Sequence, residues 1–204
     1  MTRIGRSDLD IFPLSLGGNV FGWTADRDTS FAVLDAFRDG GGNFIDTADG
    51  YSAWVPGNSG GESERIIGEW IASRRPERVV VATKVSKHPE FPGLSADNVR
   101  AAAEASLARL GVETIDVYYA HAEDPDTPLE ETVAAFGALV ADGLIRYPAV
   151  SNFSVERTRE WVRLAREKGV AEPIETQPAY NLVDRAVERD VVPTAAELGL
   201  TVVP

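Results

Sequence analysis

The sequence predicts an α/β protein with a (β/α)8 TIM-barrel fold, in which about seven strands are present and the last βα part is missing. Two observations indicate this fold. Short apolar segments alternate with helical patterns along the chain, which predicts parallel strands joined by right-handed crossovers. Polar residues also end strand after strand, and in a barrel, unlike an open sheet, such ends converge on one mouth.

Seven apolar segments are expected to form the strands. They are residues 14–18, 43–48, 79–84, 115–121, 145–152, 174–177 and 200–204. Hydrophobic segments buried on both faces are typical of parallel sheets covered by helices. We therefore expect residues 1–204 to form a single barrel domain, incomplete at its C-terminal end, as a portion of a longer protein or a truncated chain.

Amphipathic spacing predicts helices at residues 62–73, 95–111 and 154–169. The signal is strongest for a helix at 127–143. There Thr127 is the expected N-cap, Pro128 takes the first helical position, Glu130 completes a capping box and Gly143 ends the helix.

The composition narrows the class of protein. The chain has 204 residues, of which 44% are hydrophobic and 25% charged, so it can bury a sizeable core. A formal charge of -12 argues against a nucleic-acid partner. Cysteine is absent, which excludes disulfides and thiolate metal sites. No segment has the length of a membrane helix, and Asp8 and Asp10 interrupt any signal peptide, so we expect a cytoplasmic protein with no membrane partner.

The polar residues at the strand ends suggest a reaction. A tyrosine with an ordinary pKa of about 10 is a poor acid at neutral pH until a nearby cation favours its phenolate. For Tyr51, Lys84 can supply that charge, Asp46 can pair with the buried ammonium, and His121 can hydrogen-bond a substrate oxygen. Such a set aims a proton donor at a carbonyl oxygen and needs a hydride donor at the carbonyl carbon. Later strand ends carry hydroxyl and amide groups suited to a carboxamide, which nicotinamide has.

The segments "GGNFIDTADGY", "VVVATKV", "IDVYYAH", "AVSNF" and "TQPAYNLVDR" resemble, in order, the strand-end motifs of the aldo-keto reductases, most closely of the branch with a long second loop. The resemblance covers nearly the whole chain. It implies an NADPH-dependent enzyme without a metal that reduces small carbonyl compounds. By the same resemblance Tyr51 is the general acid, Asp46 and Lys84 set its pKa, and His121 orients the carbonyl. The residues implied to hold the nicotinamide carboxamide are Ser151, Asn152 and Gln177.

Aromatic residues in the loops above the rim suggest a substrate pocket. Trp23 and Trp54 are the candidates, and the loop from Ser52 to Gly61 is expected to act as a mobile flap. The second histidine, His88, is expected on the surface. Tyr118 and Tyr119 precede a strand end, so we expect them to contribute to packing rather than catalysis.

Other functions account less well for the same residues. The segment "GNSGG" satisfies G-x-S-x-G, but a hydrolase elbow requires a strand directly before it, and Pro56 precedes this one. A glycosidase needs two carboxylates across a cleft, and only Asp46 stands clearly at a strand end. The main alternative is a barrel relative that binds a cofactor or partner with little or no turnover. Pro148 keeps it open, because a proline within the fifth strand could shift Ser151 and Asn152.

Overall fold

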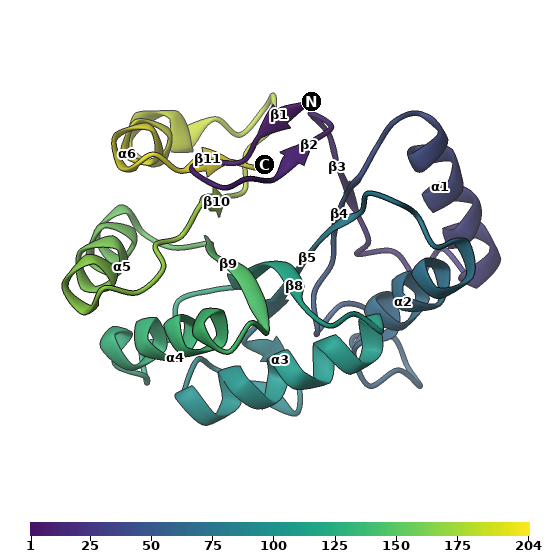
Figure 1. Ribbon diagram of the computed structural model, residues 1–204, viewed down its shortest axis with the longest axis horizontal. Coiled ribbons are helices and arrows are strands. Elements are labelled where there is room, and N and C mark those ends of the chain that lie inside the picture. The colour runs from purple at the N-terminus through teal and green to yellow at the C-terminus, as the bar shows by residue number, and fades with distance from the viewer.

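The computed structural model describes all 204 residues and contains one parallel sheet of seven strands. The predicted strands are confirmed, and each pairs with its neighbour along the chain. In sheet order they are β3 (Ser15–Gly17), β4 (Phe44–Asp46), β5 (Val80–Val85), β8 (Ile115–Ala120), β9 (Ile145–Ser151), β10 (Glu175–Gln177) and β11 (Thr201–Val202). The sheet curls into a half-barrel, as expected for part of a TIM barrel (Figure 1).

Helices follow the strands and form an arc on the outer side of the sheet (Figure 1). They are α1 (Arg27–Asp39), α2 (Glu62–Arg74), α3 (Ala96–Leu110), α4 (Leu129–Ala141), α5 (Val155–Lys168) and α6 (Val191–Leu198), with a short 3₁₀ helix η1 (Ala186–Arg189) before α6. The larger hydrophobic cluster lies between sheet and helices and includes Trp70, Phe136 and Trp161. A smaller cluster with Phe44, Val80 and Val117 fills the inner side of the half-barrel.

Two helices were not among the sequence-based predictions. α1 begins after Asp26, whose carboxylate accepts a hydrogen bond from the backbone N–H of Thr29, and it buries Phe31 and Leu34. α6 begins after Asp190 and ends at Gly199, which has a φ of 73°. Their caps are ordinary signals, since aspartate favours N-caps and glycine the left-handed C-cap.

The predicted start of α4 was wrong in detail. Pro128 takes the N-cap position, and no side chain caps the helix. The Thr127 hydroxyl instead donates to Asp124 Oδ2 at 2.7 Å, and Glu130 pairs with Lys168 Nζ at 2.6 Å. Both groups of the expected capping box thus have other partners. Gly143 follows the helix with a φ of 74°, in keeping with its expected role at the C-terminal end.

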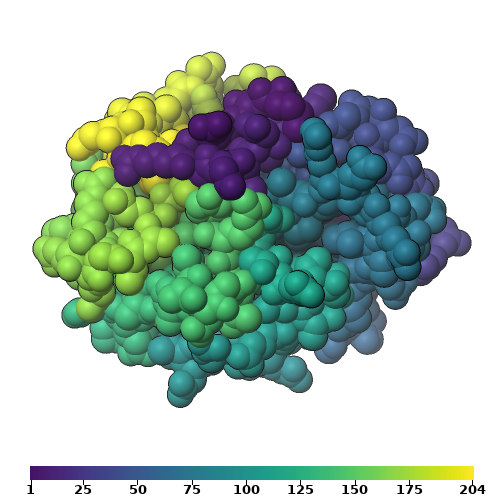
Figure 2. All heavy atoms as spheres, viewed as in Figure 1, coloured from purple at the N-terminus to yellow at the C-terminus, as the bar shows by residue number.

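Two small antiparallel hairpins accompany the main sheet. β1 (Thr2–Arg3) and β2 (Asp10–Ile11) lie across the view in Figure 2, between the end of the chain and the first helix, and contribute Ile4, Leu9 and Ile11 to the inner cluster. β6 (Lys87–His88) pairs with β7 (Phe91–Pro92) after β5. This hairpin corrects one expectation: His88 is only 3% exposed, because its ring packs on Phe91 at 5.2 Å between centroids.

β9 runs unbroken through Pro148. Tyr118 pairs with Pro148 in the register of β8 and β9, and the Pro148 carbonyl accepts a hydrogen bond from the Ile174 N–H. Ser151 then pairs with Gln177 of β10 in the same ladder. Proline lacks an N–H, yet the pairing on both sides of β9 continues past it, so Pro148 does not interrupt the strand that leads to Ser151.

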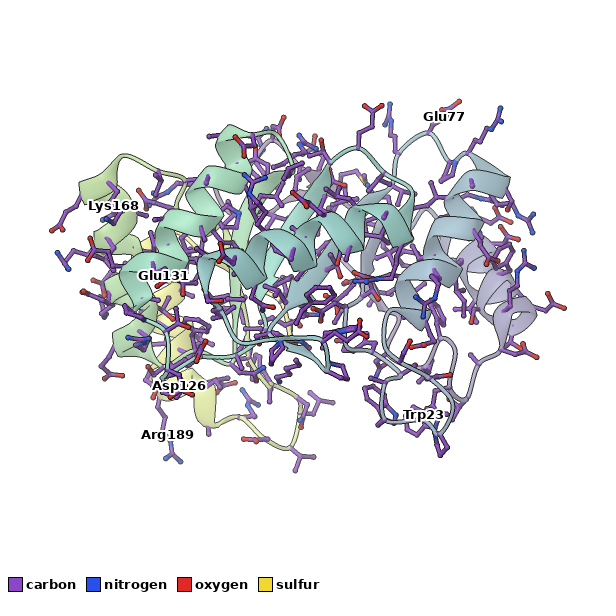
Figure 3. All side chains as sticks on the ribbon, turned by 90° about the horizontal axis from the view of Figure 1, so that it is seen from below. Trp23, Glu77, Asp126, Glu131, Lys168 and Arg189 are labelled. Atoms are coloured by element: carbon purple, nitrogen blue, oxygen red, sulfur yellow. The ribbon has the colours of Figure 1, made fainter.

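The loops after the strands gather on one side of the molecule. In Figure 3, Trp23 from the loop after β3 and Asp126 from the loop after β8 lie at the lower edge, while Glu77, which precedes β5, lies at the opposite edge. None of the helices has the length and hydropathy needed to cross a membrane. Side chains at the carboxyl ends of the strands therefore lie towards the lower edge of Figure 3.

Candidate active site

A buried lysine forms the centre of the site. Lys84, on β5, is fully buried, and its Nζ donates to both carboxylate oxygens of Asp46 at 2.7 Å. It also donates to the Thr47 carbonyl at 2.8 Å and to the Tyr51 hydroxyl oxygen at 3.0 Å. A charge removed from water is tolerated only when it is paired and hydrogen-bonded, and Lys84 meets both conditions.

The strand register brings Lys84 to Asp46. Asp46 is the last residue of β4 and pairs with Ala82 of β5. Alternate residues of a strand share a face, so Ala82 and Lys84 both point into the half-barrel, where Ala82 belongs to the inner cluster. Lys84 lies beyond the end of β4, and its long side chain reaches the carboxylate there.

Tyr51 is held by the loop that follows β4. Its N–H bonds to the Ala48 carbonyl, and the next residue, Ser52, has a left-handed φ of 66°. The buried Ser52 hydroxyl donates to the Phe21 carbonyl at 2.9 Å, and Asn58 Nδ2 donates to the Ser52 carbonyl at 3.0 Å. These bonds fix both the turn and the position of the phenol above Lys84.

The pKa of Tyr51 differs from the expectation that Lys84 would favour its phenolate. Burial raises the pKa of Tyr51, and although the Lys84 ammonium opposes that rise, the pKa stays above its ordinary value. Burial opposes the charged form of Lys84, but Asp46 and Tyr51 outweigh it and raise the lysine pKa. Lys84 is therefore charged at neutral pH and Tyr51 keeps its proton.

His121 follows β8 at the same rim. Its ring lies 5.9 Å from the Tyr51 ring, between centroids, at an interplanar angle of 74°. Burial, together with Lys84 and Lys87, lowers the pKa of His121 to about 3, so the imidazole is neutral. Its Nδ1 is buried without a hydrogen-bond partner. A neutral imidazole can offer one N–H to an oxygen ligand.

The three residues expected to hold nicotinamide form a connected group. The Ser151 hydroxyl donates to the Gln177 carbonyl at 2.9 Å, and Asn152 Nδ2 donates to Ser151 Oγ and to the His121 carbonyl, both at 3.0 Å. Gln177 Nε2 donates to Asp46 Oδ1 at 3.3 Å. Asn152 has a φ of 55°, a left-handed conformation that asparagine tolerates better than most residues.

Two tryptophans stand above the tyrosine. Trp23 and Trp54 are half exposed, at 51% and 54%, and their rings meet edge to face at 5.6 Å between centroids. Trp54 also contacts the Tyr51 ring edge-on at 6.4 Å. The two rings thus form an exposed apolar surface beside the polar residues of the rim.

Sequence reasoning missed three buried polar residues near the site. Glu175, fully buried on β10, accepts a hydrogen bond from the Tyr119 hydroxyl. Asp49 and Glu64 are fully buried on the helix side of the loop that carries Tyr51, where Glu64 is paired with Arg109. Glu175 lies two residues before Gln177, so strand alternation could have placed it on the inner face. The sequence carries no signal that Asp49 is buried.

The fold and the rim define an α/β protein with a half-barrel sheet, in which a buried lysine donates a hydrogen bond to a tyrosine hydroxyl at the carboxyl ends of the strands. Residues 13–204 match the Aldo/keto reductase family, and the chain belongs to this family. Two of the relatives carry the words oxidoreductase or reductase in their names.

Curated relatives align along almost the whole chain. It is 36% identical to "Uncharacterized oxidoreductase YrpG" of Bacillus subtilis over 99% of this chain and 64% of that protein. It is 31% identical to norsolorinic acid reductase B of Aspergillus parasiticus over 97% of this chain and 55% of that protein. It is 35% identical to a probable voltage-gated potassium channel subunit beta of Oryza sativa over 97% of this chain and 60% of that protein. The chain thus spans less than two thirds of the length of these relatives.

Proposed function

We propose that the protein is an NADPH-dependent reductase that converts aldehydes or ketones to alcohols, with Tyr51 as general acid. The observation that carries the proposal is the hydrogen bond from Lys84 Nζ to the Tyr51 hydroxyl oxygen at 3.0 Å. Lys84 can only donate, so the phenol oxygen accepts this bond and its own proton remains free for another acceptor. A carbonyl oxygen at the rim is such an acceptor.

The same contacts favour transfer of that proton. When Tyr51 gives its proton to the substrate oxygen, a phenolate forms beside a charged ammonium in a site of low polarity. Such an arrangement stabilises the developing negative charge more strongly than water would. Asp46 holds Lys84 in place through two hydrogen bonds at 2.7 Å. Neutral His121, beside the Tyr51 ring, can direct an N–H to the same oxygen.

NADPH, when bound, supplies the hydride for the carbonyl carbon. The rim offers groups that fit its carboxamide: the side-chain oxygens of Asn152 and Gln177 remain open to donors, because the hydrogen bonds of both residues are made through their side-chain nitrogens. Ser151 Oγ anchors the group between them. These residues would therefore bind and orient the nicotinamide end of the cofactor.

The two tryptophans suggest the shape of the substrate. A flat apolar compound could lie against the wall of Trp23 and Trp54, whose half-exposed rings pack edge to face. The Aspergillus relative is named a reductase, norsolorinic acid reductase B, which supports reduction as the reaction. We expect carbonyl groups on aromatic or otherwise apolar bodies to be preferred over small polar ones.

A second candidate is a binding protein of the same family that turns over slowly or not at all. It is favoured by the rice relative, which is named as a probable potassium channel subunit beta. That name belongs to a protein for which a partner, rather than a substrate, is stated. The two candidates share the rim residues and differ in turnover.

A turnover assay separates these candidates. NADPH oxidation is followed spectrophotometrically with a panel of aromatic aldehydes, short aliphatic aldehydes and ketones, and NADH is run in parallel. The reductase proposal expects carbonyl-dependent oxidation of NADPH with stoichiometric alcohol. If NADPH binds but no carbonyl compound accelerates its oxidation, the binding role is the better assignment.

A further inference from the structure

Glu175 is an acidic residue inside the half-barrel. It shares the inner face of β10 with Gln177, because the intervening Thr176 points the other way and lines a small cavity against α5 and α6. Glu175 is fully buried. One carboxyl oxygen accepts a hydrogen bond from the Tyr119 hydroxyl, and the other, Oε2, is buried with no partner.

Tyr119 connects Glu175 to the centre of the site. Tyr119 of β8 pairs directly with Lys84 of β5, so their side chains lie next to each other on the inner face. The Lys84 Nζ lies 5.4 Å from the centroid of the Tyr119 ring, within the range of a cation–π contact. Glu175 accepts the hydrogen bond of the Tyr119 hydroxyl, and Gln177, two residues further along β10, donates to Asp46.

Few charged groups share this interior. The ionisable groups that act on Glu175 are Tyr119 from β8, Asp46 from β4 and Lys84 from β5. The N-terminal hairpin contributes only Ile4, Leu9 and Ile11 to the inner cluster. Burial, with the Asp46 carboxylate, raises the pKa of Glu175 to about 8, although the Tyr119 hydroxyl and Lys84 act in the opposite direction. The ion pair that shares this interior with Glu175 is the one between Lys84 and Asp46.

We propose that Glu175 is a positioning residue for the reduction: it fixes the Tyr119 ring beside Lys84 and, as an uncharged acid, keeps the interior free of a second anion. This inference rests on the proposed reductase function. Loss of the Glu175 proton would add a second negative charge to the interior that holds the Lys84–Asp46 pair. That charge would disfavour the phenolate that Tyr51 must become, so turnover should decline as Glu175 ionises.

The test uses Glu175→Gln, which keeps an acceptor for Tyr119 and cannot ionise. At pH 7 the variant should reduce substrate within about twofold of wild type. Above pH 8 the wild-type kcat should fall, whereas the variant should keep its activity to at least one pH unit higher. Glu113→Gln, an exposed glutamate that precedes β8, is the matched control and should follow the wild-type profile.

Tyr119→Phe provides a second, independent variant. Because the Tyr119 hydroxyl favours the ionised form of Glu175, its removal should shift the alkaline decline of kcat to higher pH. An alkaline decline that is the same in Glu175→Gln and wild type would overturn the proposal. If Glu175→Gln fails to fold, a pH profile of Tyr119→Phe that matches the wild-type profile would overturn the proposal.

Unfolding by urea, followed from pH 5 to 9, gives a readout that does not depend on turnover. If Glu175 binds a proton in the folded protein, the urea midpoint of wild type should fall relative to Glu175→Gln as pH rises towards 8. A constant difference would show that Glu175 is already ionised and would refute the proposal. If the midpoints diverge but no carbonyl compound is reduced, the reductase function has failed, and the positioning role fails with it. If wild type is active and only the pH profiles coincide, Glu175 alone was misassigned.

Discussion

Lys84 Nζ lies 3.0 Å from the Tyr51 hydroxyl oxygen, although the two residues are 33 positions apart in the sequence. The contact exists because β4 and β5 are neighbours in the sheet and the loop after β4 folds back over the end of β5. Asp46 holds the Lys84 ammonium through two hydrogen bonds, and the hydrogen bond from the Ser52 hydroxyl to the Phe21 carbonyl fixes the turn that carries Tyr51. The Tyr51 hydroxyl therefore lies next to one buried ammonium, that of Lys84.

Replacing Tyr51 with phenylalanine removes the proposed proton donor and keeps the ring against Trp54 and His121. We expect kcat to fall by roughly 10²-fold or more, the size of a general-acid contribution, while the Kd of NADPH stays nearly unchanged. Steady-state kinetics and a fluorescence titration measure the two quantities. Tyr147→Phe is the control, because this tyrosine bonds Asp8 near the start of β9, and it should retain activity. Unchanged turnover in Tyr51→Phe would exclude it as the acid.

Lys84→Met leaves the Asp46 carboxylate buried without its cation. Breaking a buried pair in this way costs about 3–5 kcal/mol, so we expect a large loss in the free energy of unfolding. Adding Asp46→Asn removes the stranded charge and should restore part of that stability. Activity should remain low in both variants, because neither has an ammonium beside Tyr51. Recovery of activity in the double variant would show that Lys84 has only a structural role.

The strands and their polar ends could be predicted from the sequence because each is a local pattern. Seven apolar segments spaced by helices are enough to fix the order of the parallel strands, and Asp46, Lys84 and His121 stand at the ends of three of them. The meeting of these side chains follows from convergence at a common rim. Their proposed roles came from the family resemblance and not from spacing.

Other features depend on packing that no local pattern encodes. His88 looked like a loop residue, yet the hairpin of β6 and β7 buries it. Thr127 stands where the sequence pattern predicts an N-cap, but its hydroxyl donates to Asp124 instead. The net rise in the Tyr51 pKa reflects desolvation, and desolvation is a property of the folded site rather than of its residue types.

The wall formed by Trp23 and Trp54 predicts a size dependence. Trp54→Ala removes one ring of the pair and its contact with Tyr51. We expect KM for bulky apolar aldehydes to rise by about tenfold, since losing an apolar contact of this size costs on the order of 1–2 kcal/mol, while KM for short aldehydes changes little. Kinetics on a matched series of aldehydes measures the effect. Equal changes across the series would assign Trp54 to local packing.

Asp49 predicts how stability depends on pH. It is fully buried, neither carboxyl oxygen has a partner, and burial, with the nearby Glu64 carboxylate, raises its pKa to about 8. Unfolding returns that pKa to its ordinary value near 4, so between pH 4 and 8 the folded protein holds a proton that the unfolded chain has lost. This contribution to the free energy of unfolding therefore falls with rising pH, by about 1.4 kcal/mol per unit, and levels off above 8.

Asp49→Asn removes this dependence without changing the shape of the side chain much. The variant should differ least from wild type near pH 4 and become progressively more stable than it up to pH 8. Urea unfolding at several pH values measures the difference. Asp28→Asn, on the exposed first turn of α1, serves as the control and should track wild type. If Asp49 is ionised at every pH tested, the stability difference between wild type and Asp49→Asn will stay constant, which would contradict the prediction.

Asn152 links the rim to the proposed nicotinamide site and can be removed without new backbone strain. Its φ of 55° suits glycine at least as well as asparagine, so Asn152→Gly should fold normally. The variant lacks the amide that bonds Ser151 and the His121 carbonyl, and with it the side-chain oxygen offered to the carboxamide. Loss of one or two hydrogen bonds should weaken NADPH binding by about tenfold. Reduced nicotinamide mononucleotide, which has the carboxamide but no adenosine half, is the matched ligand and should weaken by a similar factor. If NADPH alone weakens, Asn152 acts on another part of the cofactor; if neither changes, the carboxamide is held elsewhere.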